Sequence, residues 1–311
     1  MKHIMTITLS LLTLLTSAAF TDPAQSPTTI TVTENAALLK DGKPFHAIGV
    51  NFANAFWRTV NNPNNTTYDR SFKALADLNI NLARVPFCYY WASEMKLYTQ
   101  NEIEYFRRLD AVHAAAQKHN IHLIPSLFWA YWTVPDIVKE PCKSWADPNS
   151  KTIAFMKTYV KKVLTRYNDS NVIIGWEIGN EWNLPADLPN ASKHRPPTVT
   201  AKGTPAKRSK DDEITHEILT AALSAVATEI RKYDPHRFIT SGNAAPRPSA
   251  WHQHKFLTWK KDTPAQHIKM LQLQNPDPIN VISIHCYNPN YDFALAQTAA
   301  KLAKKPLFIG E

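Results

Sequence analysis

Glycine is scarce in this chain of 311 residues, with seven residues against 22 prolines. The glycine-rich G-x-G-x-x-G loop and the P-loop pattern are both missing, which argues against an enzyme that binds nucleotides. Charged residues make up 20% of the chain and hydrophobic residues 44%, with nine tryptophans. This balance excludes a disordered, collagen-like or coiled-coil chain and supplies enough apolar material for one large core or two small ones.

Cysteine is also rare, because the chain contains only Cys88, Cys142 and Cys286. Three residues cannot form a disulfide framework. One bridge between Cys88 and Cys142 is compatible with export, and buried free thiols are the alternative, which we favour for Cys286. No C-x-x-C pair and no histidine or cysteine cluster with zinc spacing is present. We therefore predict no metal site and no cofactor.

No long tract of one charge accompanies the formal net charge of +9. The basic residues are spread along the chain, which favours general solubility and surface adhesion over a dedicated anionic partner. We predict no nucleic-acid partner. A basic adhesin remains a weaker hypothesis that depends on the charge alone.

The N-terminus has the order of a secretory signal peptide. Lys2 and a neighbouring histidine precede the apolar stretch Ile4–Phe20, and small residues at 17–19 close it. We predict a signal peptide over residues 1–19 and a catalytic barrel domain over 20–311, secreted or periplasmic and monomeric. An uncleaved anchor is the alternative. No later segment is apolar enough to cross a bilayer, so we expect no membrane contact after the signal is removed.

Short apolar runs alternate with helical patterns along the rest of the chain. The expected strands are Phe45–Val50, Asn81–Pro86, His122–Leu127, Val172–Ile178, Phe238–Ser241, Val281–His285 and Pro306–Gly310. The expected helices are Tyr68–Leu78, Asn101–Lys118, Ser150–Tyr167, Asp212–Tyr233, Pro264–Leu273 and Phe293–Lys304. Asp147 or Asn149 is the expected N-cap of the third helix. Asp211 or Asp212 is the expected N-cap of the fourth. Thr29–Leu39 is expected to form one short strand before the first repeat.

Alternating strands and helices imply parallel strands, and their number favours a (β/α)8 TIM barrel. Closure needs one more strand and helix than the pattern supplies, so we expect a C-terminally truncated barrel. Residues 185–210 interrupt the pattern with a stretch rich in proline, lysine and threonine. This insertion follows the fourth expected strand, where barrels keep variable loops. It is either a loop facing the substrate or a disordered segment.

Two expected strands end in acidic residues. Asn180 and Glu181 follow the apolar strand around Ile173 and are flanked by tryptophans, and Glu311 directly follows Leu307–Gly310. Because the carboxyl ends of barrel strands share one rim, these two carboxylates are expected to meet there. Two carboxyl groups at about 5–5.5 Å are the requirement of a retaining glycosidase.

At this point the residues resemble a known family. The segments are NLARVPF with Arg84, GWEIGNEW with Asn180 and Glu181, IHCYNP with His285 and Tyr287, and PLFIGE with Glu311. They are similar to the glycoside hydrolases of family 5, the cellulase and mannanase clan of (β/α)8 retaining enzymes. The resemblance implies Glu181 as the acid/base and Glu311 as the nucleophile.

The same resemblance implies roles for the neighbouring polar residues. Arg84 and Tyr287 would support the nucleophile, Asn180 would bind the sugar 2-hydroxyl, and His285 would line the sugar site. Glu177 has the same parity as Glu181 on its strand, and we interpret it as a polar barrel residue that positions Arg84 or His285. The pattern departs from the family at the third strand, HLIPSLFWAYW, where many members carry a histidine.

Aromatic residues follow several of the expected strands and favour a glycan ligand, because sugar rings stack on flat aromatic faces. They are Trp57, Tyr90, Trp91, Trp129, Tyr131, Trp132 and Trp182. The group around Trp129 and Trp132 is the expected wall of a subsite. We expect a secreted retaining β-glycosidase that acts on a β-1,4-linked polysaccharide. A mannanase is the first choice, followed by an endoglucanase and then an exo-acting β-mannosidase or β-glucosidase. A non-catalytic carbohydrate-binding barrel is the alternative.

Overall fold

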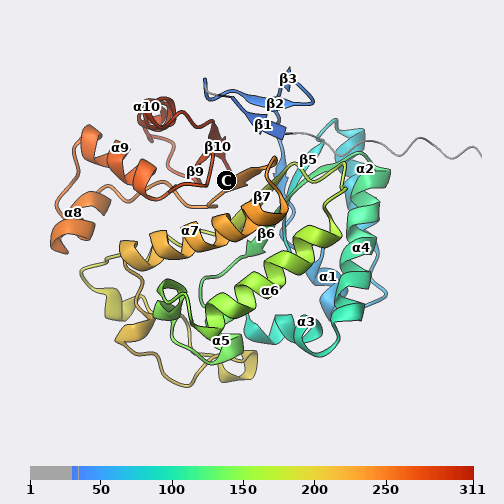
Figure 1. Ribbon diagram of the computed structural model, residues 1–311, viewed down its shortest axis with the longest axis horizontal. Helices are drawn as coiled ribbons and strands as arrows, with labels where there is room; N and C mark the ends of the chain where they lie inside the picture. The colour runs from blue at the N-terminus through green and yellow to red at the C-terminus, as the bar shows by residue number, and fades with distance from the viewer. Residues whose placement is uncertain (1–29, 34) are drawn as a thin grey trace, which may run out of the picture.

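The structure is a computed structural model that describes residues 30–33 and 35–311 (Figure 1). The predicted signal peptide, residues 1–19, lies outside the described residues. Five parallel strands follow one another in chain order within one sheet. They are β4 (Val50–Asn51), β5 (Leu82–Pro86), β6 (His122–Phe128), β7 (Gly175–Gly179) and β8 (Phe238–Thr240). Strands β9 (Ile282–Ile284) and β10 (Leu307–Ile309) form a second parallel pair.

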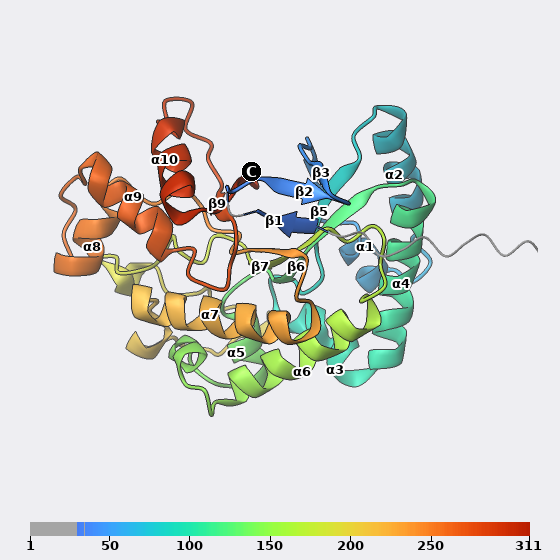
Figure 2. The same cartoon turned by 45° about the horizontal axis from the view of Figure 1, so that its top comes forward.

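Helices cover the outer face of the strands (Figures 1 and 2). The longer ones are α2 (Thr67–Asp77), α4 (Glu102–Lys118), α6 (Lys151–Arg166), α7 (His216–Tyr233), α9 (Pro264–Leu273) and α10 (Phe293–Ala303). The shorter ones are α1 (Trp57–Asn61), α3 (Lys96–Gln100), α5 (Thr133–Val138) and α8 (Ala250–Phe256). All six predicted helices are therefore present, with ends that differ by a few residues.

Two predicted N-caps are wrong. The Ser150 hydroxyl, and neither Asp147 nor Asn149, accepts the Ile153 amide at the start of α6, at 3.1 Å. At the start of α7 the Thr215 hydroxyl accepts the Ile218 amide at 3.2 Å. The predicted caps Asp211 and Asp212 belong instead to a short 3-10 turn, Lys210–Asp212. Serine and threonine satisfy the free amides of a first helical turn as well as aspartate does, so residue type alone did not select the cap.

The two groups of strands continue one barrel wall. The Asn280 amide donates to Ile239 O at 3.3 Å, and the Asn280 side chain accepts the Ile239 amide at 2.8 Å, so β9 follows β8. Between β10 and β4 the described wall is open, with a cavity of about 520 Å³ lined by residues that include Val50 and Phe308. The Asn51 side chain bridges this opening by donating to Gly310 O at 3.1 Å. The fold is a (β/α)8-type barrel, as predicted.

The segment predicted as one strand, Thr29–Leu39, forms part of an antiparallel sheet instead. This sheet contains β1 (Ile30–Val32), β2 (Leu38–Lys40) and β3 (Lys43–Pro44). Ile30 is buried against the first residues of several barrel strands, including Leu82 and Phe238. The small sheet therefore closes the barrel at the amino ends of its strands, which leaves the carboxyl ends for the site.

The insertion at residues 185–210 is folded, with 3-10 turns at Ala191–Lys193 and Thr200–Lys202. Arg208, whose side chain is 3% exposed, joins it to the barrel by a bidentate ion pair with Asp136 at 2.7 and 2.8 Å. Pro185 and Pro197 line a cavity at the carboxyl ends of the strands. Of the two alternatives for this insertion, the loop that faces a cleft is the one observed.

The three cysteines are free thiols, so the bridge suggested between Cys88 and Cys142 is absent. Burial raises the pKa of both of these thiols above the ordinary range. Cys286, for which a buried thiol was favoured, is partly exposed. None of the described helices is long and apolar enough to span a membrane.

Candidate active site

The carboxyl ends of four strands bring the predicted residues together. Arg84 lies on β5, Glu181 follows β7, His285 follows β9 and Glu311 follows β10. One carboxylate oxygen of Glu181, one imidazole nitrogen of His285 and one carboxylate oxygen of Glu311 all lie within 4.8 Å of one another. Residues 26 to 130 positions apart in sequence therefore form one cluster, because the strands that carry them end at the same rim.

The backbone at Glu181 is held in an unusual conformation. Its φ is +54°, in the left-handed region that residues other than glycine rarely adopt. The Glu181 amide donates to Gly242 O at 2.8 Å, and the preceding Asn180 amide donates to Trp129 O at 2.9 Å. Only glycine fits at position 242, because a Cβ there would lie 1.9 Å from Gly179 O. The loops after β6 and β8 thus fix the direction of the Glu181 side chain.

Glu311 is surrounded by hydrogen-bond donors. The Arg84 guanidinium pairs with one of its oxygens, and the Tyr287 hydroxyl donates to the other. Burial alone raises the pKa of Glu311, but the Tyr287 hydroxyl, His285 and Arg84 outweigh it, and the net pKa is lowered. The hydrogen bond to Glu311 in turn raises the pKa of Tyr287 to about 12. Glu311 is therefore ionised near neutral pH while Tyr287 keeps its proton.

Arg84 is the centre of a buried polar network. Its Nε donates to both oxygens of Glu177 at 2.8 Å, and its Nη2 donates to Asn180 Oδ1 at 2.8 Å. The guanidinium carbon lies 4.6 Å from the centre of the Trp129 ring, in a cation–π arrangement. The prediction that Glu177 positions Arg84 is confirmed. The hydrogen bond from Arg84 Nη2 fixes the orientation of the Asn180 amide, the predicted ligand of a sugar hydroxyl.

His285 lies between the two acids. Its Nδ1 is 3.4 Å from Glu181 Oε1 and 3.5 Å from Glu311 Oε1. Both ring nitrogens are buried without a hydrogen bond of good geometry. Gly310 allows the imidazole this position, because a Cβ at Gly310 would lie 2.6 Å from His285 Nε2. The imidazole nitrogen Nδ1 therefore lies close to one oxygen of each acid.

Asn51 belongs to this cluster and was not predicted. Its Oδ1 accepts from Arg84 Nη1 at 3.3 Å while its side-chain nitrogen donates to Gly310 O. The available signal was its place at the end of the first barrel strand, directly after Val50, but a single asparagine after a two-residue strand is a weak pattern.

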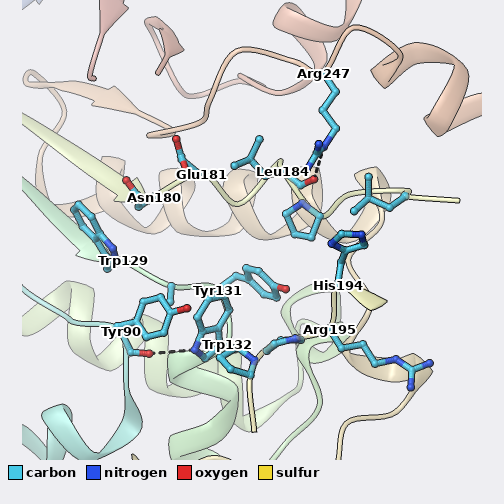
Figure 3. A pocket seen from close by; sticks show the side chains of 15 residues that line it. Tyr90, Trp129, Tyr131, Trp132, Asn180, Glu181, Leu184, His194, Arg195 and Arg247 are labelled. Atoms are coloured by element: carbon cyan, nitrogen blue, oxygen red, sulfur yellow. Dashed lines mark hydrogen bonds between the residues drawn. The ribbon is translucent and has the colours of Figure 1, made fainter. Parts of the chain in front are cut away.

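A cavity of about 330 Å³ lies against Glu181 and Asn180 (Figure 3). Trp129 and the Tyr90–Trp132 pair lie on one side of it, and Arg247 enters from the other. The rings of Tyr90 and Trp132 meet edge to face with centroids 4.6 Å apart, and Trp132 Nε1 donates to Tyr90 O at 3.1 Å. Trp129 and Trp132 are partly exposed and line this cavity, and their role as the wall of a subsite stays a prediction.

Trp182 does not present such a face. Its side chain is 2% exposed, packs against Trp145, and donates Nε1 to Phe128 O and Trp129 O at 3.1 Å. It holds the loop after β6 in place rather than offering a surface to the cleft. Tyr131 is likewise buried, although it reaches the cavity wall. The sequence could not separate these residues from their exposed neighbours, because all of them follow strand ends.

A second cavity of about 820 Å³ adjoins the first and shares Glu181, Leu184 and Arg247 with it. Its lining continues over residues 244–248, 261–264 and 285–288. Glu181 therefore lies where two cavities meet, which is the position required of a group that acts on a bond in the middle of an extended ligand.

Two groups of side chains have a composition that could hold a metal ion in the described part of the chain, namely the cluster above and the group Asp187, His216 and His254. In the second group both histidines contact Asp187 Oδ2 through Nδ1, at 2.7 and 3.0 Å. The Gln274 side-chain nitrogen lies 3.0 Å from His216 Nε2 and makes that atom an acceptor. The proton of His216 therefore resides on Nδ1, and the group is a hydrogen-bonded network around Asp187 rather than a set of free ligand atoms.

A (β/α)8 barrel with two acidic side chains close together at the carboxyl ends of its strands has the architecture typical of glycoside hydrolases. The chain belongs to glycosyl hydrolase family 5, because the family model described as Cellulase (glycosyl hydrolase family 5) matches residues 38–307.

Curated relatives include fungal proteins. The chain is 30% identical over 177 residues to a protein named "Probable mannan endo-1,4-beta-mannosidase A" from Aspergillus flavus, covering 51% of this chain and 45% of that protein. It is 35% identical over 86 residues to "Probable mannan endo-1,4-beta-mannosidase C" from Aspergillus terreus, covering 28% of this chain and 18% of that protein. The chain therefore spans less than half the length of these relatives.

Solved structures share the fold. The endo-1,4-beta-mannanase from Rhizomucor miehei superposes with a TM-score of 0.61 at 17% identity, over 90% of this chain and 80% of that one. The beta-mannanase from the blue mussel Mytilus edulis gives a TM-score of 0.58 at 15% identity, over 92% and 83% of the two chains. These similarities show the barrel fold.

Proposed function

We propose that this protein is a retaining β-glycosidase that cleaves β-1,4-linked mannan, with Glu311 as nucleophile and Glu181 as acid/base. The observation that carries the proposal is the proximity of the two carboxyl groups, which have oxygens within 4.8 Å of each other. This separation suits direct attack by one carboxylate on a sugar carbon. An inverting enzyme needs about 6.5–9.5 Å between its carboxyl groups to admit a water molecule.

In the first step the ionised Glu311 attacks the anomeric carbon of the bound sugar, and the glycosidic bond breaks. The Glu181 carboxyl gives its proton to the departing oxygen, which leaves as an alcohol, and an ester joins the sugar to Glu311. In the second step the Glu181 carboxylate takes a proton from a water molecule, whose oxygen attacks the same carbon. The ester breaks, Glu311 becomes a carboxylate again, and the product keeps its β configuration.

The surroundings of the two acids suit these roles. Arg84 and Tyr287 lower the pKa of Glu311 and keep it ionised before attack. The Asn180 amide, held by Arg84, is directed toward the rim where it could bind the sugar 2-hydroxyl. The side chain of Tyr287 is 76% exposed and can meet a ligand directly.

Mannan is the first-choice substrate because the curated relatives carry names of mannan-degrading enzymes. Two adjoining cavities on either side of Glu181 suit a long chain cut internally. A β-1,4-glucan is the second choice, and an exo-acting β-mannosidase or β-glucosidase is the third. The proposal includes no metal or organic cofactor, because two carboxyl groups suffice for the chemistry.

The test is the stereochemistry of hydrolysis. Mannan, cellulose, xylan and laminarin oligosaccharides are supplied to the protein, and the first-formed reducing end is followed by proton NMR. We expect a β anomer from the mannan oligosaccharide and products of several lengths. An α anomer as the first product would exclude the ester mechanism, and cleavage of laminarin alone would exclude the proposed linkage.

We also propose that the protein is exported to the periplasm or the medium. The support is the order of basic, apolar and small residues over positions 1–19. Mass spectrometry of the protein from culture supernatant and from cells gives the test. A mature N-terminus near residue 20 in the exported fraction is expected, and an intact Met1 found only inside cells would contradict it.

A further inference from the structure

The side chain of Arg247 enters the active-site cleft without a counter-charge. It belongs to the loop between β8 and α8 and lines both cavities beside Glu181. Its Nε donates to Leu184 O at 2.9 Å, and this is the only hydrogen bond that its guanidinium makes within the described residues. Burial lowers its pKa, and no neighbouring charge acts against that effect. Both terminal nitrogens are therefore free to meet a ligand.

Several other partly or fully buried arginines of this chain pair with carboxylates, whereas Arg58 and Arg231 donate to neutral oxygen atoms of Thr67, Asp234 and Arg237. Arg84 pairs with Glu177 and Glu311, Arg208 with Asp136, Arg237 with Asp234, and Arg195 with Glu213. Burying a cation without such a partner is costly, because the guanidinium loses water and gains nothing in return. Arg247 differs from these residues in facing a cavity, so a bound molecule can supply the missing partner.

No acid within the described residues pairs with Arg247. Glu181 is the one acidic residue among the 15 that line the first cavity, whereas His194, Arg195 and Arg247 are basic. In Figure 3 the guanidinium lies beside Leu184 on the side of His194, away from the aromatic wall. The charge of Arg195 is satisfied by Glu213. The free positive charge of this cavity is therefore that of Arg247.

The second cavity does not compensate this charge either. Its Asp262 accepts the Trp251 and His252 amides at 2.8 and 3.2 Å and the His252 ring nitrogen at 2.7 Å. Its Asp292 accepts the Ala294 amide at the start of α10. Both carboxylates are thus already engaged at the ends of helices.

We propose that Arg247 forms a subsite for a carboxylate-bearing sugar unit, such as a uronate, within the glycan bound across Glu181. This inference rests on the proposed glycosidase function and adds the substrate class. A guanidinium presents its N–H groups in a planar fork that matches the two oxygens of a carboxylate. A sugar hydroxyl could also accept one of these bonds, but it would leave the positive charge uncompensated. The aromatic wall opposite would hold the neutral units of the same chain by stacking.

The experiment compares carboxymethylated mannan oligosaccharides with the same neutral oligosaccharides, using the wild type, R247Q and R247K. We expect the wild type to favour the carboxylated substrate in kcat/KM by about tenfold, the effect of one strong charge-assisted contact. R247Q should abolish this preference, while R247K should keep part of it, because lysine retains the charge and loses the fork. The matched control is R70Q, which makes the same change of charge at an exposed position on α2.

Two measurements keep this inference separate from the proposed function. Hydrolysis of the neutral oligosaccharide without any preference that depends on Arg247 would overturn the carboxylate subsite and leave the glycosidase intact. If neither substrate is cleaved, calorimetric binding of the two oligosaccharides decides the question. Tighter binding of the carboxylated one, lost in R247Q but not in R70Q, supports the subsite. Equal binding, or equal loss in both variants, overturns it. The preference should also weaken as salt is raised, since it depends on charge.

Discussion

Glu181 and Glu311 are chemically identical side chains in different surroundings. Glu311 is held by Arg84 and Tyr287, with a side-chain exposure of 14%. Glu181 is 25% exposed, and His285 is the one cationic or potentially cationic group within 4.0 Å of it in the described chain. The donors around Glu311 stabilise its carboxylate form and lower its pKa. This difference in neighbours supports the proposed roles, with Glu311 as the nucleophile and Glu181 as the acid/base.

The strongest test of the difference between Glu181 and Glu311 is to replace each acid in turn by alanine. On an aryl β-mannoside with a good leaving group, E311A should lose on the order of 10⁴-fold or more in kcat/KM, because no ester can form. E181A should lose less, because such a leaving group needs no proton. The rates are measured spectrophotometrically.

Added azide provides the control for this experiment. In E181A it should attack the ester in place of activated water and give the β-glycosyl azide. In E311A it can occupy only the vacated nucleophile position and should give the α-glycosyl azide. The two anomers are distinguished by NMR, and the same anomer from both variants would contradict the assignment of roles.

A second substitution removes the charge of Glu177, which holds the Arg84 guanidinium beside Glu311. In E177Q the buried Arg84 guanidinium loses a bidentate partner whose side chain is fully buried. Breaking a buried ion pair by removing one charge destabilises a protein by about 3 kcal/mol. We expect urea unfolding to show a loss of this size together with reduced turnover. An unchanged unfolding midpoint would mean that Arg84 does not depend on Glu177.

A smaller effect is expected from Y287F, which removes one donor from Glu311. The pKa of Glu311 should rise, because its charged form loses a hydrogen bond. The acidic limb of the kcat/KM profile should therefore move to higher pH, with a loss of about tenfold at acidic pH. Y291F is a suitable control, since the Tyr291 hydroxyl contacts His267 and not an acid. An acidic limb that does not move would place the relevant titration elsewhere.

The smallest effect concerns stability. The pKa of Glu311 is lower in the folded protein than its ordinary value of 4.5. Its contribution is therefore fully present above about pH 4.5 and is lost as the pH falls through the folded pKa. Urea unfolding of the wild type and E311Q at several pH values should give stabilities that converge as the pH falls. A gap that stays constant from pH 6 to pH 3 would show that Glu311 is not stabilised in its charged form.

Much of the barrel could be predicted because local signals agreed with the fold. Helix α9 begins where Thr263 caps Pro264 and exchanges hydrogen bonds with Gln266, a pattern visible in the sequence. Strands β5 and β6 are buried on both faces, and their apolar runs marked them. Phe45–Val50 and Thr29–Leu39 are each predicted as one strand, whereas the structure has the two-residue β4 at Val50–Asn51 and pairs Ile30 with Lys40 across a turn, which alternation of apolar residues does not reveal.

Some residues of the site could likewise be predicted from the sequence, and others could not. The acids at strand ends could be predicted, because the end of a barrel strand has a known location in space. Asn51 and Arg247 could not, since their importance comes from neighbours brought near by folding. Trp182 shows the converse, because a tryptophan beside the predicted acid turned out to be buried in the loop packing. The place of a residue after a strand therefore predicts that it lies at the rim of the barrel, but it does not predict whether its side chain faces the cleft or the interior of the loop.

The left-handed backbone of Glu181 has a consequence for how this protein can evolve. Such a conformation costs an ordinary residue about 1–2 kcal/mol, which glycine avoids. Glycine at this position would therefore be expected to raise the melting temperature while removing the proposed proton donor. A search for thermostable descendants by folding alone would select against activity at this residue, so any such screen must couple heat resistance to turnover.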